Sequence, residues 1–229
     1  MSAGSPARWV REQSLSLFFG ALFLLTLVGQ ALAGWHQFND QQLADGMGRL
    51  SLGQYLTSAD FAVDVTENWQ SEYLQFLVFL VAGIWLFQKG STESKKLDRP
   101  GLESDEDQEV GPHAADDSPR WAAAGGWRTG VFSSSLTLMM SAIFLVSWLA
   151  QSVAGWAAFN ETRLAQLQDP ITWGQYLLNA DFWARTLQNW QSEFLAVGSM
   201  VILSVYLRQR GSAQSKPVGA AHEETADEG

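Results

Sequence analysis

The sequence of 229 residues has no cysteine and only three histidines. The absence of cysteine excludes a disulfide framework, a thiolate metal site and a cysteine nucleophile. Three histidines are too few for a histidine-rich metal centre. The sequence also lacks a GxxxxGK[ST] phosphate loop, an HExxH zinc motif and a GxSxG nucleophile elbow. It therefore predicts no cofactor and no metal, and we expect a protein that is not an enzyme.

Charge is missing from long stretches of the chain and concentrated in others. Eight of the 24 acidic residues lie between positions 98 and 117, and four more are among the last seven residues. Such acidic segments bury too little apolar surface to offset their ordering entropy. We therefore predict a disordered acidic linker over residues 96–134, which leads into the next apolar run, and a disordered acidic tail over residues 217–229.

Four apolar runs account for most of the hydrophobic residues. The runs 15–33 and 136–154 carry no charge over 19 residues each, which matches a hydrocarbon core of about 30 Å. The runs 74–87 and 195–207 are too short to span unless each helix extends N-terminally through the sequence Asn-Trp-Gln-Ser-Glu. The alternative is that these two runs form short buried or re-entrant segments.

Lysine and arginine are distributed unevenly around these runs. Eleven of the 14 flank one side, and the three on the other side are Arg49, Arg163 and Arg185. The positive-inside rule then puts both termini and the linker in the cytoplasm. We expect a multi-pass protein of the bacterial inner (plasma) membrane, with a cytoplasmic segment at residues 1–13.

The chain is an internal duplication. Residues 14–95 align with residues 135–216 at a constant offset of 121 positions, and 33 of the 82 pairs are identical. Both repeats begin on the same side of the membrane, so we expect parallel repeats related by a pseudo-two-fold axis. The predicted fold is an all-α membrane protein with four transmembrane helices, as two parallel two-helix repeats with outward amphipathic helical segments.

The duplicated Gly-Gln-Tyr-Leu and Asn-Trp-Gln-Ser-Glu segments are motifs that the chain shares with a known protein family. With these motifs the chain resembles a family of uncharacterised bacterial integral membrane proteins that is defined as a domain of unknown function. The resemblance covers nearly the whole chain. It implies a bacterial inner-membrane protein and supplies no catalytic residue, substrate or activity.

Polar residues that occur in both repeats are the candidates for function. Glu72 and Glu193 would lie at the outward-facing boundary of the bilayer. Two opposed carboxylates there perturb each other's pKa or bind a cation. The alternative is that they are ordinary interfacial residues in contact with water. The candidate polar site comprises Glu72, Glu193, Asn68, Asn189, Gln54, Gln175, Asp60 and Asp181.

Asp60 and Asp181 are expected near helix starts, where a carboxylate caps free N–H groups, although a cation ligand is the alternative. Tryptophan side chains are half apolar, so they favour the membrane interface. The predicted interface anchors are Trp35, Trp156, Trp69 and Trp190.

Two functions from different classes fit this pattern. The first is a non-enzymatic membrane protein that organises or senses at the outer face, because the spans lack deep ionisable groups. The alternative is a small channel or transporter for an ion or small solute at the pseudo-two-fold interface. The expected surroundings are a lipid bilayer and no nucleic acid, and a second copy or another membrane protein remains an open alternative as partner.

The topology is testable with reporter fusions. A reporter that works only in the cytoplasm should be active when it is fused after Lys96 or Gly229 and inactive after Gly53 or Gly174. Activity at either glycine would contradict the arrangement of four spans.

Overall fold

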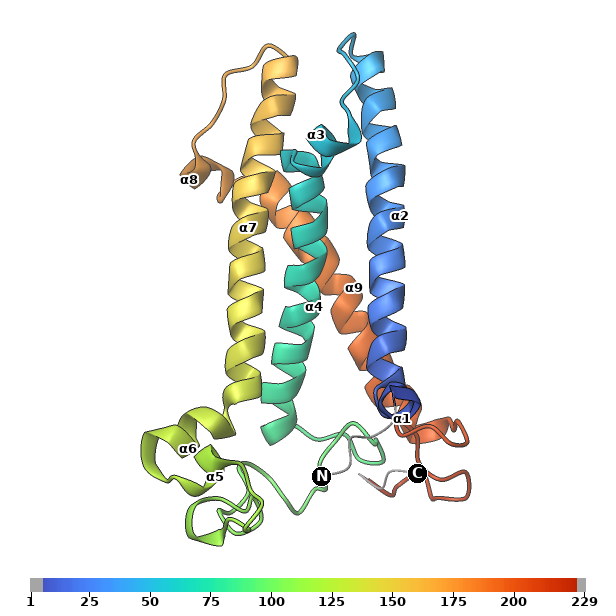
Figure 1. The fold of residues 1–229 in the computed structure, drawn as a ribbon, viewed down its shortest axis with the longest axis vertical. Helices are drawn as coiled ribbons and strands as arrows, with labels where there is room; N and C mark the ends of the chain where they lie inside the picture. The colour runs from blue at the N-terminus through green and yellow to red at the C-terminus, as the bar shows by residue number, and fades with distance from the viewer. Residues whose placement is uncertain (1–5, 226–229) are drawn as a thin grey trace. The chain divides into compact units, whose positions relative to one another are not determined.

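The computed structural model describes residues 6–225, and within that range the chain is helical with no strand. This confirms the all-α class. The elements, labelled in Figure 1, are α1 (Pro6–Glu12), α2 (Ser14–Ala44), α3 (Leu52–Leu56), α4 (Ala59–Trp85), the 3-10 helix η1 (Gly111–His113), α5 (Arg120–Ala123), α6 (Gly126–Ser133), α7 (Ser135–Ala165), α8 (Trp173–Tyr176) and α9 (Ala180–Tyr206).

Two of the described helices are long and apolar enough to cross a membrane. They are α2 and α7, with 31 residues each and mean hydropathies of 2.1 and 1.7 over their most apolar stretches. Helices α4 and α9 have 27 residues each. Both continue N-terminally through the Asn-Trp-Gln-Ser-Glu sequence, which the shortness of their apolar runs predicted. At 1.5 Å per residue each measures about 40 Å.

The chain forms two compact parts, Met1–Asp64 and Val65–Gly229, and α4 continues from the first into the second. These parts do not coincide with the two repeats predicted from the alignment. From Val65 onward, side chains of α4 bond to the second repeat; for example, Trp190 on α9 donates to Gln70. This contact ties the end of the first repeat to the second.

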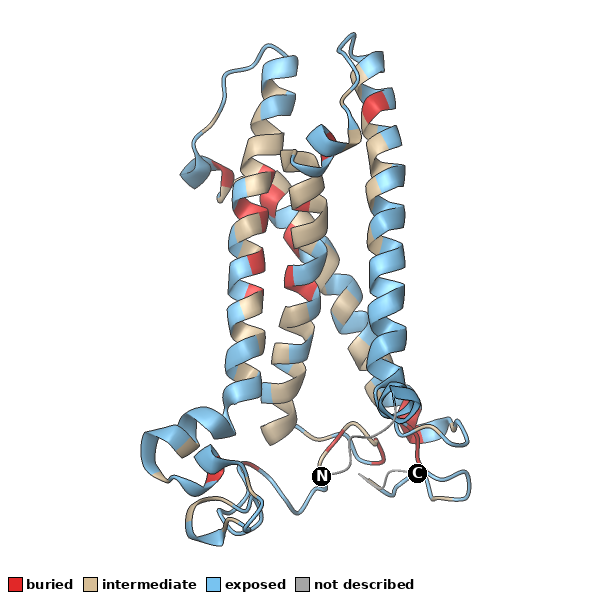
Figure 2. Cartoon of the chain, viewed as in Figure 1, coloured by how far each residue is buried: buried red, intermediate tan, exposed pale blue. Residues whose placement is uncertain are grey.

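Buried positions in the second part, coloured red in Figure 2, include many polar residues. On α7 the buried residues are Phe144, Ser147, Gln151, Ser152 and Gly155. Small and polar residues at a helix interface allow close approach and hydrogen bonding between helices, as in membrane bundles. Gln151, with 1% of its surface exposed, donates from Nε2 to Thr186 Oγ1 on α9 at 3.5 Å.

The linker contains local structure that its composition did not predict. Within residues 96–134 lie η1, α5 and α6. Trp121 and Trp127 contact edge to face at a centroid distance of 5.8 Å, and Thr129 Oγ1 donates to the Trp121 carbonyl at 2.9 Å. The two tryptophans supply apolar surface that the acidic residues 103–117 lack, and this explains why α5 and α6 form next to α7.

The tail is also bonded to the rest of the second part. Lys216, with 1% of its surface exposed, donates from Nζ to the carbonyls of Ala221, His222 and Glu224 at 3.0–3.1 Å. The backbone N–H of Gly90 donates to Thr225 Oγ1 at 2.9 Å. The predicted disordered tail thus makes specific contacts up to residue 225. Its residues 226–229, and residues 1–5 of the predicted cytoplasmic segment, lie outside the described residues.

Replacing Lys216 should release this tail. We expect Lys216→Met to lower the free energy of unfolding by about 1–3 kcal/mol, because charged hydrogen bonds are lost. A glutamate-specific protease should then cleave faster at Glu223 and Glu224. The control is Arg210→Met at an exposed arginine, and equal cleavage rates in the two variants and the unmodified chain would contradict the bonded tail.

Candidate functional site

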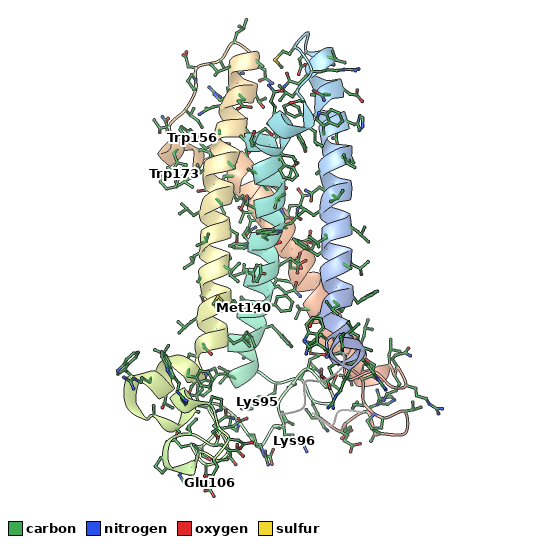
Figure 3. The ribbon with its side chains drawn as sticks, viewed as in Figure 1. Lys95, Lys96, Glu106, Met140, Trp156 and Trp173 are labelled. Carbon is green, nitrogen blue, oxygen red and sulfur yellow. The ribbon has the colours of Figure 1, made fainter. Side chains whose placement is uncertain are left out.

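The loop after α7 is held by one tryptophan and one asparagine of that helix. Trp156 Nε1 donates to the carbonyl of Ile171 at 2.7 Å, and Asn160 Nδ2 donates to the same carbonyl at 3.0 Å. The backbone N–H of Ile171 donates in return to Asn160 Oδ1 at 2.9 Å. Figure 3 labels Trp156 on α7 and Trp173, which follows this loop at the start of α8. We call these three bonds the loop clamp.

The first part of the chain contains the same clamp. Trp35 Nε1 and Asn39 Nδ2 donate to the Leu50 carbonyl at 2.7 and 3.0 Å, and Leu50 N–H donates to Asn39 Oδ1 at 2.7 Å. Both hydrogen-bonding groups of one loop residue are therefore satisfied in each repeat. Trp35 and Trp156, predicted as interface anchors, each bond to a loop carbonyl.

A tyrosine lies against a glycine in each clamp region. Tyr55 and Tyr176 are 2% and 1% exposed. A Cβ built on Gly155 would lie 2.5 Å from the Tyr176 hydroxyl oxygen, and one on Gly34 would meet Tyr55 still more closely. Glycine is therefore required at both positions, since any side chain would displace the tyrosine.

Gln54 and Gln175, two members of the predicted polar site, cap short helices. Each completes a capping box: Gln54 Oε1 accepts from the backbone N–H of Ser51 at 2.9 Å, and Gln175 Oε1 accepts from that of Thr172 at 2.8 Å. Each glutamine is present in both repeats because it caps the start of a short helix, α3 or α8.

Asp60 and Asp181 lie in the first turns of α4 and α9, as predicted. The N-cap of α9, however, is Asn179, whose side chain accepts from the backbone N–H of Asp181 at 2.9 Å. The Asp181 carboxylate instead accepts from the Tyr176 hydroxyl at 3.0 Å. It also lies 3.5 Å from Arg185, which is consistent with the spacing of four residues between them.

Helices α4 and α9 meet through a polar seam, defined here by Glu67, Gln70, Ser71, Glu72, Arg185, Trp190 and Glu193. Gln70 is fully buried, and its Oε1 accepts from Trp190 Nε1 at 2.7 Å. Ser71 Oγ donates to Glu193 Oε1 at 3.5 Å, and the Glu72 carboxylate lies within electrostatic reach of Glu193. Ser71 thus links α4 to Glu193 directly, whereas Glu72, exposed on α4, acts on Glu193 only through its charge.

The seam also contains an ion pair that the sequence did not predict. Arg185 Nη1 lies 3.2 Å from Glu67 Oε2. The duplication pairs Arg185 with Asp64 and Glu67 with Gln188, so neither charge is repeated. A comparison that retained only repeated residues could not find this pair.

Three predicted residues remain, Asn189, Asn68 and Trp69. Asn189 Nδ2 donates to the Arg185 carbonyl of its own helix at 2.9 Å. Asn68 and Trp69 are exposed on α4. Of the two predicted anchors on α4 and α9, Trp190 therefore belongs to the seam, whereas the Trp69 side chain is exposed on the surface of α4.

Nearly the whole chain matches one protein-family model. The family model described as "Domain of unknown function (DUF6766)" matches residues 6–227. The chain belongs to the DUF6766 family. This confirms the resemblance to a family of unknown function. Comparisons with curated proteins and with solved structures found no match.

The duplicated residues of this DUF6766 chain are explained largely by the clamp, the capping boxes and the glycine–tyrosine contacts. The seam differs from them, because its charged side chains face one another across two helices. Like charges in such a position respond to protonation or to a bound cation. The seam is therefore the candidate functional site.

The glycine–tyrosine contact predicts a sharp effect of one methyl group. Gly155→Ala should lower the free energy of unfolding by about 1–3 kcal/mol, because the new Cβ overlaps the Tyr176 hydroxyl. Gly174→Ala is the control, since a Cβ there meets no atom within 4 Å. Equal stabilities in thermal unfolding would contradict this packing.

The Tyr176–Asp181 bond predicts a dependence on alkaline pH. Burial and the neighbouring Asp181 carboxylate raise the pKa of Tyr176 above its ordinary value. The folded state therefore holds the hydroxyl proton more tightly than the unfolded state, and stability is lost as the pH rises above about 10.

Tyr176→Phe should cost about 1 kcal/mol at pH 7 and should flatten the loss of stability above pH 10. Tyr206→Phe, at an exposed position on α9, serves as the control. An unchanged alkaline profile in Tyr176→Phe would show that this tyrosine does not carry the effect.

Proposed function

We propose that the chain is a multi-pass protein of the bacterial inner membrane in which α2, α4, α7 and α9 all span. The hydropathy of α2 and α7 supports this, as does the length of α4 and α9, which is about 40 Å each. The excess of lysine and arginine on one side puts both termini in the cytoplasm. The loop clamps then face outward.

We further propose that the protein is not an enzyme and acts as a sensor at the outer face. The observation that carries this proposal is the hydrogen bond between Ser71 on α4 and Glu193 on α9, beside the like charge of Glu72. Two neighbouring carboxylates at a membrane boundary repel each other, and a bound cation reduces that repulsion. Such neutralisation would draw the outward ends of α4 and α9 together.

The Glu67–Arg185 ion pair lies in the same seam as these carboxylates and links α4 to α9. Its charges already compensate each other at 3.2 Å. The Gln70–Trp190 bond likewise satisfies both partners. A change in external cation concentration would therefore act on Glu72 and Glu193, while the neighbouring contacts hold the two helices in register.

A double-mutant cycle tests the seam. Glu72→Gln and Glu193→Gln each remove the same repulsion, so the double variant should gain less stability than the sum of the two single variants. Residues in contact usually couple by about 0.5–3 kcal/mol, whereas independent sites add to within about 0.5 kcal/mol. The measurement is the free energy of unfolding at pH 7 in detergent.

The control cycle combines Glu193→Gln with Glu106→Gln in the acidic linker, and it should be additive. Millimolar calcium should shift the thermal midpoint of the unmodified protein and have a smaller effect on the double variant. Strict additivity of Glu72→Gln and Glu193→Gln would contradict the shared site.

The alternative function is a small channel or transporter that uses the same seam. The neighbouring carboxylates favour this alternative, because acidic side chains line cation pathways. Reconstituted liposomes distinguish the two functions. The sensor proposal expects no flux of cations or small solutes above that of empty liposomes, and flux that is lost in Glu193→Gln would establish the channel instead.

A further inference from the structure

A cavity of about 360 Å³ lies between α7 and the α8–α9 segment. Its volume is in the range of small-molecule pockets, and such pockets are largely apolar with a few polar groups. The lining residues are Leu145, Trp148, Leu149, Ser152, Leu177, Phe182 and Trp183. All belong to the second compact part of the chain.

The two tryptophans that line the cavity occur only in the second repeat. At the equivalent positions of the first repeat, Trp148 is replaced by Leu27 and Trp183 by Ala62, whereas Phe182 is matched by Phe61. Two tryptophans thus occur in the second repeat at positions that line one cavity. The maintenance of the shared helical scaffold does not require this difference, since the first repeat forms its helices without it.

Trp148 is the central residue of the cavity wall. Its ring stacks near Phe144 and Phe182 at centroid distances of 5.5 and 6.2 Å, and it contacts Trp183 at 6.3 Å. Its Nε1 is buried and has no hydrogen-bond partner among the described residues. Protein atoms shield this N–H from the cavity, so the site offers a ligand mainly apolar surface.

We propose that this cavity binds an acyl chain of a membrane phospholipid, packed against the rings of Trp148 and Phe182. The inference rests on the proposed membrane location. Helix α7, which forms one wall, is apolar enough to span a bilayer, so the cavity opens toward lipid chains. Ser152 and Trp173, bonded at 3.2 Å, close its outward end with polar groups suited to the interface.

The lipid site adjoins the seam. Trp148 contacts Trp190 at a centroid distance of 5.9 Å, and Trp190 donates to Gln70 beside Ser71. A lipid chain that fixes the Trp148 ring would therefore also restrict Trp190. The occupied cavity would hold the seam in the arrangement described here.

Binding can be measured on the full-length protein in detergent by native mass spectrometry. The probe is dioleoyl phosphatidylethanolamine, added in steps. Leu145→Trp narrows the cavity, and we expect it to weaken lipid binding about tenfold. The matched control is Leu138→Trp, at an exposed leucine two turns earlier on α7, which should bind lipid as the unmodified protein does.

Crosslinking identifies the binding position. A phosphatidylethanolamine with a diazirine in its acyl chain should label residues 145–152 and 177–183 above all other segments, and Leu145→Trp should reduce that labelling. Equal labelling of α2 and α7, or equal binding by both tryptophan variants, would overturn the proposal. Labelling by photoreactive oleate and not by the phospholipid probe would also overturn it.

These outcomes are distinguishable from failure of the sensor proposal. Loss of lipid binding in Leu145→Trp is independent of coupling between Glu72 and Glu193, which is measured without added lipid. If the double-mutant cycle is additive and lipid binding is specific, the lipid-binding proposal is supported and the sensor proposal is contradicted. If the cycle is coupled and no lipid binds, the reverse holds.

Discussion

Each of the two compact parts depends on a two-way hydrogen bond between one asparagine and one loop residue. Asn160 accepts from the Ile171 N–H and donates to its carbonyl, and Asn39 does the same for Leu50. A loop that returns along a helix must satisfy its backbone groups without water. The asparagine amide, with one acceptor and one donor group, does this from a single helical position.

The positions of the other groups follow from this constraint. Once Ile171 is fixed, the capping box of Thr172 and Gln175 starts α8 and puts Tyr176 against Gly155. Tyr176 then donates to Asp181 in the first turn of α9. The direction of α9 brings Arg185, Trp190 and Glu193 to the seam, and it brings Phe182 and Trp183 to the cavity below α8. The proposed sensor and the proposed lipid site thus share one support.

Sequence reasoning predicted the helices well because their signals are local. The length of the apolar runs and the repeated Asn-Trp-Gln-Ser-Glu sequence predicted that α4 and α9 extend N-terminally, and both helices do so. The tandem Gly-Gln-Tyr-Leu segments were recognised as important, but their capping role became visible only with three-dimensional contacts. A side chain that caps and one that binds a ligand look alike in a repeat comparison.

Contacts between residues that differ in the two repeats could not be predicted by comparing the repeats. Glu67 pairs with Arg185, yet each is replaced in the other repeat, so the internal comparison removed both from consideration. Trp148 and Trp183 were missed for the same reason. The acidic tail was judged by composition alone, whereas the three carbonyls around Lys216 depend on the path of the chain.

Hydrogen exchange at two loop amides tests the central claim most directly. Asn39 and Asn160 fix the loops that follow α2 and α7, so the amides of Leu50 and Ile171 should exchange as slowly as helical amides, despite lying outside any helix. In Asn160→Ala the Ile171 amide alone should become fast, with Leu50 unchanged. Exchange at both amides as fast as in residues 104–107 of the linker would contradict the clamp.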